Sequence, residues 1–398
     1  MNAGVTADGT VPGRHGAGLT VLLAAMAGLG AANLYYAQPM VGLIGAEFRL
    51  HGAAAAQVST AAQVGYMVGI VLLVPLGDLF DRRRLIIVLT AALVLSLLAA
   101  AAAPNLAWLL AASVAIGVSA TLAQQAVPLA ASLASPAVAG RAVGQVLSGL
   151  LVGILFARTL SGLVAEHSGW RAMYGLGALI AAALMGAAWF GLPTTRPITP
   201  PRYTRLLASV YDLVKRHGVL RAAAAVQGLL FAGFNAFWAV LALHVQQPPF
   251  GMGPAGAGLF GLLGLTGVLI APAVGRMVDH QGPWRVGSVG VVLVLSGWAV
   301  AGVLPGLPGL VLAVALLDAG LQTALVSNQA AVFALDQASR SRINAAFVAA
   351  IFLGGALGSA CGSLAWYHLG WPGVLLTGAG FTATALAVQV FLQHRTRR

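Results

Sequence analysis

Hydrophobic residues run along this chain in long uninterrupted stretches that are separated by short polar segments. A stretch of about 18 or more apolar residues can cross a bilayer as a helix, whereas the strands of membrane barrels are shorter and alternate in polarity. The pattern therefore predicts twelve membrane-spanning helices. Their expected ranges are 19–44, 54–76, 85–103, 107–131, 142–165, 172–191, 220–245, 255–274, 286–304, 309–335, 343–366 and 372–392.

Composition supports this class of protein. Hydrophobic residues make up 59% of the chain and charged residues only 8%, whereas a soluble domain carries about 25% charged residues. Most side chains therefore face lipid, and we expect an all-α membrane protein. Residues 1–17 are polar, and the first span is too long for the core of a signal peptide, so we expect it to remain as an anchor.

The basic residues indicate the orientation of the chain. If the N-terminus is cytoplasmic, 18 of the 21 Lys and Arg residues fall in or beside inside segments, Arg49 and Arg171 fall outside, and Arg158 lies within a span. This distribution follows the positive-inside rule and predicts that both termini are cytoplasmic. The basic residues of the inside segments also account for the net charge of +12. We therefore read this charge as a signal of orientation and expect no nucleic-acid partner.

The longest polar interruption divides the predicted spans into two sets of six. Residues 192–217 contain a proline cluster and a basic tail, which are typical of a cytoplasmic linker with a short interfacial helix near 203–216. The expected domains are a tail (1–17), a first six-helix bundle (18–191), the linker (192–217), a second six-helix bundle (218–393) and a short tail (394–398).

The two halves share a sequence repeat. A shift of 201 residues aligns 140–170 with 341–371 and matches an arginine, a histidine and a tryptophan as well as glycines. A second match aligns GDLFD (Gly77 to Asp81) with GRMVD (Gly275 to Asp279). Such a repeat predicts two six-helix bundles related by an axis along the membrane normal, with a binding site between them that opens to either side.

Two loops on the predicted cytoplasmic side carry a Gly-x-x-x-Asp motif with arginines nearby. An aspartate there can accept backbone N–H groups at the next helix start or pair with arginine. Such contacts can form in one conformation and break in another, so we predict that both loops are conformational latches. Their candidate residues are Gly77, Asp81, Arg82, Arg83 and Arg84 in the first loop, and Gly275, Asp279, Gly282 and Arg285 in the second.

Twelve spans in two parallel halves, with these loops after spans two and eight, resemble the major facilitator superfamily. The resemblance covers residues 18–393, although the first loop, GDLFDRRRL, lacks the internal glycine of the family motif. The stretches NLYYAQP, ARTLSG and SNQA further resemble a bacterial branch whose members are mostly described only as transporters, often as drug or metabolite exporters. The resemblance implies transport by rocking of the two bundles.

A permanent charge lies within the fifth span. Arg158 is 17 residues beyond Arg141, which corresponds to about 25 Å along a helix. An arginine at the centre of a membrane costs at least about 2.5 kcal/mol and is a functional candidate by default. It replaces the proline of the family's antiporter motif in this span, while Gly153 and Gly162 stay small. Arg158 can hold an anionic group of a substrate, or its side chain can extend outward to the membrane surface.

Asp318 is the only acidic residue deep within a span. Because burial disfavours an ionised carboxyl group, Asp318 is a candidate proton carrier. Two other interpretations are open: an ion pair with Arg158 across the two halves, and a local hydrogen bond with Gln322. The arginine that many proton-driven exporters carry in span four is absent here, where Ser113 stands in its place.

Polar side chains in lipid should face a central cavity or neighbouring helices. Amide and aromatic groups in such a cavity suit an uncharged or mixed-polarity solute. The candidates are Asn33, Tyr36, Gln38, Gln63, Tyr66, Gln124, Gln125, Asn235, Trp238, Gln322, Asn328 and Gln329. In span eight, glycines recur at every third residue from Gly258 to Gly267, and we expect them to pack closely against span five.

The sequence contains no nucleotide-binding loop, no HExxH motif and a single cysteine, Cys361, so we expect no enzyme activity, cofactor or metal site. We expect a monomeric secondary active transporter of the bacterial inner membrane that exports a small organic solute in exchange for protons. The alternatives are an uptake symporter or facilitator for an organic anion, and a membrane sensor without transport.

Overall fold

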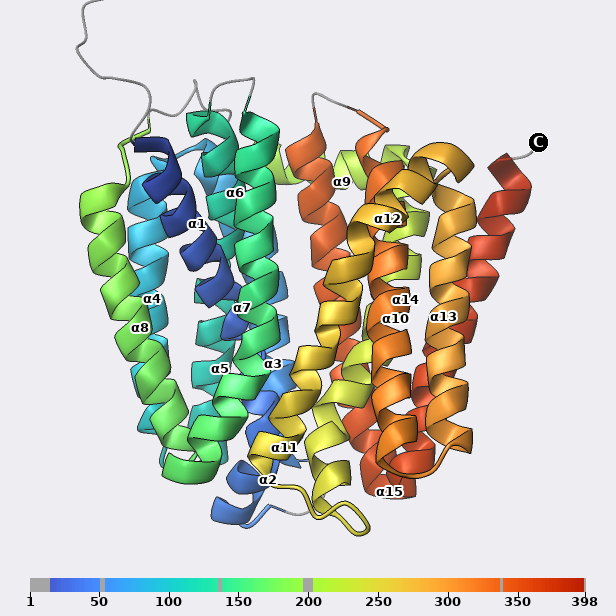
Figure 1. The fold of residues 1–398 in the computed structure, drawn as a ribbon. Coiled ribbons are helices and arrows are strands. Elements are labelled where there is room, and N and C mark those ends of the chain that lie inside the picture. Colours follow the sequence, from blue (N-terminus) through green and yellow to red (C-terminus); the bar gives the residue numbers. More distant parts are fainter. Residues whose placement is uncertain (1–14, 51–53, 135–137, 196–202, 337–338, 397–398) are drawn as a thin grey trace, which may run out of the picture.

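The computed structural model describes residues 15–50, 54–134, 138–195, 203–336 and 339–396. Every regular element within these residues is a helix (Figure 1). Residues 1–14 of the expected tail and 196–202 of the expected linker lie outside the described residues.

The first bundle contains six spans. Several spans are divided into shorter helices by local breaks, as at Asn33–Tyr36, before Pro39. The elements are α1 (His15–Ala32) and α2 (Ala37–Glu47); η1 (Ala54–Ala56), α3 (Gln57–Leu73) and η2 (Val74–Asp78); α4 (Arg82–Ala101); α5 (Leu106–Ala120) and α6 (Leu122–Leu133); α7 (Ala139–Ser168); and α8 (Trp170–Gly191).

The second bundle repeats this arrangement after the linker helix α9 (Tyr203–Arg216). Its elements are α10 (Gly218–Gln246); α11 (Pro254–Leu259), η3 (Phe260–Gly264) and α12 (Leu265–Gln281); α13 (Pro283–Val303); α14 (Gly306–Phe333); and α15 (Arg340–Thr396). Eleven apolar segments of the described chain are long enough to cross a membrane. The last one, in α15, is broken at Gly370 and holds two spans, so the predicted fold of twelve spans in two bundles is confirmed.

The two ends of the molecule can be told apart by the chain. We call the end where α1 begins and α15 ends the terminal face, and the end where α7 passes into α8 the opposite face (Figure 1). Most buried apolar side chains fall into two large cores, one drawn mainly from the first bundle and one from the second. Each bundle therefore has its own hydrophobic core, as a unit that moves as one body requires.

Glycine contacts join equivalent helices in both bundles. A Cβ atom on Gly153 in α7 would overlap the backbone of Gly28 in α1, and a Cβ atom on Gly354 in α15 would overlap the backbone of Gly228 in α10. Gly153 and Gly354 are matched by the 201-residue repeat. Because lipid tails are as apolar as leucine, close backbone approach at small residues is a main source of helix association in membranes.

The repeat also places glycine at two equivalent turns on the opposite face. Gly169, between α7 and α8, has a φ of 80°, and Gly370, within α15, has a φ of 63°. This region of backbone space is costly for residues with a Cβ atom. Each glycine precedes a tryptophan, Trp170 or Trp371, which packs against aromatic neighbours. The sequence repeat is thus a repeat of backbone geometry.

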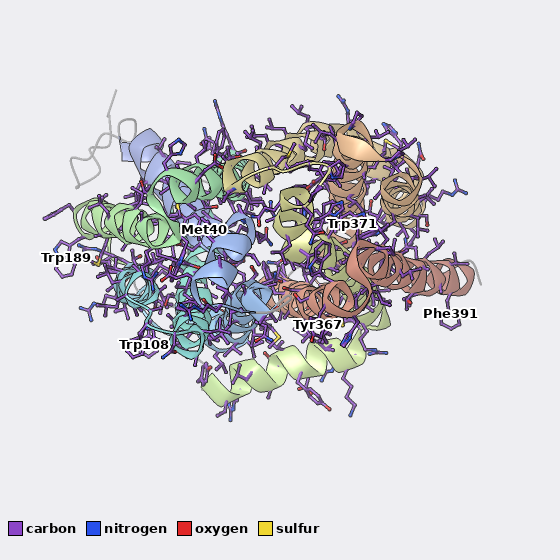
Figure 2. The ribbon with its side chains drawn as sticks, turned by 90° about the horizontal axis from the view of Figure 1, so that it is seen from below. Met40, Trp108, Trp189, Tyr367, Trp371 and Phe391 are labelled. Atoms are coloured by element: carbon purple, nitrogen blue, oxygen red, sulfur yellow. The ribbon has the colours of Figure 1, made fainter. Side chains whose placement is uncertain are left out.

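Helix α9 lies across the spans. It is seen side-on in Figure 2, where most other helices are seen close to end-on. It contacts α10 and α15 of the second bundle and η2 of the first, and the hydroxyl of Tyr203 donates to the carbonyl of Leu72 at 2.8 Å. Its position matches the interfacial helix expected near 203–216.

We predict that Gly358→Ala destabilises the second bundle. A Cβ atom at Gly358 would overlap the backbone of Ala232 in α10, so the helices must separate, at a cost of about 1–3 kcal/mol. Gly380→Ala is the matched control, because its Cβ atom would meet no atom within 4 Å and alanine favours helix. Thermal unfolding in detergent, followed by tryptophan fluorescence, should give a lower midpoint for Gly358→Ala only. Equal midpoints would contradict the packing argument.

Candidate functional site

The two bundles touch along one interface near the opposite face. In the first bundle it is formed by α2, α3 and the end of α7, and in the second by α10, α11, η3 and α15. Figure 1 shows the bundles meeting near α2 and α11. We call this set of helices the bundle interface.

The glycines of span eight lie in this interface, as the sequence predicts. Cβ atoms on Gly258 and Gly261 would press against the backbone and side chain of Arg158 in α7, and one on Gly264 would meet Leu155. Gly267, one step further along the stripe, faces α14 instead, where Asp318 and Gln322 lie. Close packing against span five is therefore confirmed for the first three glycines.

Four hydrogen bonds between described residues cross the bundle interface. The Nε2 of Gln63 donates to the Oδ1 of Asn235 at 2.6 Å. The hydroxyl of Thr60 donates to that of Ser359 at 2.7 Å, and the hydroxyl of Thr159 donates to the carbonyl of Gly258 at 3.0 Å. The backbone N–H of Ala255 donates to the Oε2 of Glu166 at 2.8 Å.

Arg158 lies at the centre of this interface and is 3% exposed. Its Nε donates to the Oε1 of Gln38 at 2.7 Å. The guanidinium carbon lies 4.0 Å from the centroid of the Trp238 ring and 4.5 Å from that of Tyr35. Tyr35 and Gln38 belong to the first bundle and Trp238 to the second, so the charge is enclosed by both. The side chain does not extend to the membrane surface.

Asp318 is half-buried in α14, and its Oδ2 is enclosed without a hydrogen-bond partner among the described residues. It interacts electrostatically with Arg158. The described residues form two ion pairs within 4.0 Å, Arg82–Asp78 and Arg171–Glu47, and neither involves Asp318. No hydrogen bond joins Asp318 to Gln322 among the described residues either, so the proton-carrier interpretation stays a prediction.

Other cavity candidates bond within one bundle. Gln124 donates to the hydroxyl of Tyr66 at 2.9 Å, and Gln125 donates to the carbonyls of Leu73 and Val74 at 3.2 Å. Asn328 donates to Gln227 at 3.0 Å, and Gln329 donates to Asn344 at 3.4 Å.

Asn33 and Tyr36 have a similar internal position. Asn33 donates to the carbonyl of Leu29 at 2.6 Å, and both side chains lie beside Gly177 of α8. These contacts stabilise the first bundle. The candidates that the structure brings together at the bundle interface are therefore Gln38, Gln63, Asn235 and Trp238, with Tyr66 at its edge through a ring contact with Phe352.

The first candidate latch is bound to its own bundle and to Thr195 at the start of the linker. The Oδ1 of Asp81 accepts from the backbone N–H groups of Arg83 at 2.9 Å and Thr195 at 3.1 Å, and from the hydroxyl of Thr195 at 2.9 Å. Arg82 pairs with Asp78 at 2.8 Å and donates to the carbonyl of Gly77, while Arg83 donates to the carbonyl of Trp189.

Arg84 is exposed. In the second loop, Gly282 has a φ of 82° between α12 and α13. Asp279 and Arg285 are exposed and make no hydrogen bond or ion pair with any other described residue. The structure therefore shows no hydrogen bond or ion pair of either loop with the other bundle in the part of the chain that it describes.

Sequence reasoning missed some of the residues that join the bundles. Neither Tyr35 nor Glu166 is among the candidates named from the sequence. Glu166 follows Arg158 by eight positions, about two helical turns, so both lie on nearly one face of α7. The spacing of Arg158 and Glu166 could therefore have indicated a second contact across the bundle interface.

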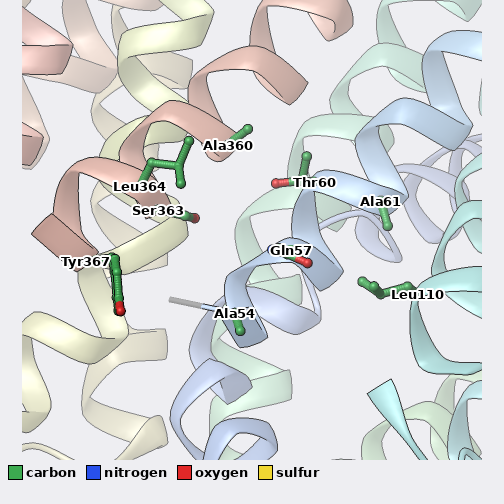
Figure 3. A pocket seen from close by; sticks show the side chains of 9 residues that line it. All are labelled: Ala54, Gln57, Thr60, Ala61, Leu110, Ala360, Ser363, Leu364 and Tyr367. Atoms are coloured by element: carbon green, nitrogen blue, oxygen red, sulfur yellow. The ribbon is translucent and has the colours of Figure 1, made fainter. Parts of the chain in front are cut away.

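A separate cavity of about 530 Å³ lies between α3 and α15 (Figure 3). Gln57, Thr60, Leu110, Ser363, Leu364 and Tyr367 are among its lining residues. Leu364 and Tyr367 are 60% and 59% exposed, so this cavity is open to the surface of the molecule. It is distinct from the enclosed cluster around Arg158.

Comparison with known proteins agrees with this architecture. The sequence model described as Major Facilitator Superfamily matches residues 20–339. The chain is 37% identical over 371 residues to an uncharacterized transporter, YgaY, of Escherichia coli O157:H7, covering 93% of this chain and 94% of that protein. It is 34% identical over 380 residues to a probable transporter of Streptomyces coelicolor, covering 92% and 86% of the two chains.

Solved structures show the same fold at low sequence identity. The nucleoside transporter NupG matches with a TM-score of 0.77 and 12% identity, over 94% of this chain and 99% of that one. A bacterial homologue of the lysosomal transporter Spinster, in an inward-facing occupied conformation, matches with a TM-score of 0.76 and 13% identity, over 98% of both chains. The family match and the two relatives go further than fold: this chain is a multi-pass membrane transporter and belongs to the major facilitator superfamily.

Proposed function

We propose that this protein is a secondary active transporter that moves a small organic solute across the bacterial inner membrane by alternating access. The observation that carries this proposal is one-sided closure: two pseudo-symmetric bundles, each with its own core, meet through contacts near the opposite face. The basic residues favour a cytoplasmic terminal face. In that orientation the structure corresponds to a state closed toward the outside, and the bundle interface is the outer gate.

Asp318 supports coupling to protons. It is an acidic side chain inside a membrane span, its Oδ2 has no hydrogen-bond partner among the described residues, and it lies next to glycine-rich span eight at the edge of the gate. An intramembrane carboxyl group of this kind is typical of proton relays in transporters. If Asp318 carries a proton inward while the solute moves outward, the protein exports the solute in exchange for protons. Latch contacts between the terminal-face loops and the other bundle belong to the opposite, outward-open state.

Arg158 favours a second candidate, uptake of an organic anion together with a proton. Its charge has no ionic partner within 4.0 Å among the described residues. If an anion binds beside Arg158, it favours the protonated form of nearby Asp318, because two negative charges close together repel. Anion and proton then bind together, which is symport, whereas exchange requires that they exclude each other.

We predict that Asp318→Asn loses at least tenfold in proton-driven flux but keeps solute exchange, because the amide cannot release a proton while the fold and the gate remain. The measurement uses proteoliposomes with an internal pH dye, an imposed pH gradient and the solute identified by a resistance and metabolite-tolerance screen. Asp212→Asn, in the exposed face of α9, is the control. Unchanged proton-driven flux in Asp318→Asn would remove Asp318 from the coupling mechanism. The direction of proton movement separates exchange from symport.

We predict that Glu166→Ala opens the outer gate. Its carboxylate accepts from the start of α11 in the other bundle, a charge-assisted contact that also benefits from the helix dipole of span eight. Spin labels at exposed Ala107 and Leu307, in a Cys361→Ser background, should report a new, longer distance. Glu47→Ala is the matched control, because Glu47 pairs with Trp170 and Arg171 of its own bundle. Identical distance distributions in both variants would show that the Glu166 contact does not hold the gate.

A further inference from the structure

We propose that Arg158, Gln38 and Trp238 form an anion-binding site at the bundle interface, and that it takes the carboxylate group of the transported solute. The inference rests on the proposed transport function and names the chemical class of the substrate, an organic acid.

The site is a cluster of hydrogen-bond donors without acceptors. The Nε2 of Gln38 and the Nε1 of Trp238 are both enclosed and have no partner among the described residues, and the two side chains are 2% and 3% exposed. Buried donors are normally paired, and an unpaired one calls for an unseen acceptor. The Oε1 of Gln38 already accepts from Arg158, so the amide must present its NH₂ group to the remaining space.

Arg158 adds a positive charge to the same place. Its Nε donates to Gln38, and the rings of Tyr35 and Trp238 both lie within 4.5 Å of the guanidinium carbon. Among the described residues no side chain or carbonyl accepts from its two terminal nitrogens, which leaves the edge that binds carboxylates in a two-pronged manner. An arginine held by this hydrogen bond and two ring contacts has little orientational freedom, so this edge is preorganised.

A cavity lies beside Gln38 and Trp238. It is lined by Gln38, Trp238, Leu241 and Ala257, among others, and has a volume of about 10 Å³. This is the room that a single water-sized atom group needs. One oxygen of a carboxylate fits it, while the rest of the solute must lie outside this cavity. A chloride ion carries the same charge and can accept from the same donors, whereas a cation would be repelled by the guanidinium of Arg158.

The test uses the purified full-length protein in lipid nanodiscs, with acetate as the probe and acetamide as its neutral counterpart of equal shape. Acetate should raise the midpoint of thermal unfolding in a saturable manner, and acetamide should not. Arg158→Gln should remove the saturable effect. Trp238→Phe keeps the ring over the guanidinium and removes only the N–H donor, so it should weaken acetate binding about tenfold. Trp108→Phe, on the exposed surface of α5, should leave it unchanged.

Parallel titrations with chloride distinguish the two sources of the anion. Saturation by acetate, with chloride at most a weak competitor, supports the carboxylate assignment. Saturation by chloride alone overturns that assignment and leaves an inorganic anion site. If neither anion binds better than acetamide, or if both Arg158→Gln and Trp238→Phe bind acetate like the unmodified protein, the site does not exist. Flux measurements separate a failure of the anion site from a failure of the proposed transport function. Anion binding without flux would refute transport alone. Flux of an uncharged solute that is unaffected by Trp238→Phe would refute the anion site alone.

Discussion

The structure depends on one constraint, the inability of hydrocarbon to satisfy a polar group. Each buried donor or acceptor must find a partner inside the protein. Most hydroxyl groups do so locally, as Thr90 and Ser113 do by donating to carbonyls four residues earlier. Side chains that cannot do so are drawn to other helices, and Gln63 finds Asn235 in the other bundle. The charge of Arg158 is the most costly of these groups to bury, and it lies where the two bundles meet.

Small residues complete this arrangement, because they let backbones approach where no hydrophobic driving force exists between helices. The close contacts of Gly153 with Gly28 and of Gly354 with Gly228 lie inside the two bundles, and they make each bundle one tightly packed body. The contact of Gly258 with Arg158 lies between the bundles. Close contacts at glycine therefore occur in the permanent packing within each bundle. In the proposed mechanism, they also occur in a contact between the bundles that must form and break. The difference lies in the neighbouring polar bonds, which at the interface are few and side-chain mediated.

The spans, their grouping and the packing of the span-eight glycines could be predicted from the sequence, because each leaves a local signal: an apolar run, a proline-rich interruption or a glycine period. The hydrogen-bond partner of each polar side chain could not be predicted from the sequence. In a helix that is apolar all round, periodicity does not tell which neighbour an amide faces. Gln63 and Gln125 therefore look alike, although Gln63 bonds across the interface and Gln125 bonds to the backbone of another helix in its own bundle. The partners of Asp81 were equally hidden, since Thr195 is 114 residues away.

The position of Arg158 has a consequence for any movement of the bundles. Tyr35 and Trp238 stabilise the guanidinium from opposite bundles, and desolvated contacts of this kind are worth about 2 kcal/mol each. Opening of the interface must take Trp238 away from Arg158 or carry Arg158 away from Gln38 and Tyr35. In either case a buried charge loses part of its solvation, which is costly unless water, an anion or ionised Asp318 replaces it. In the proposed mechanism, the conformational equilibrium and the occupancy of this site are therefore linked, as secondary transport requires.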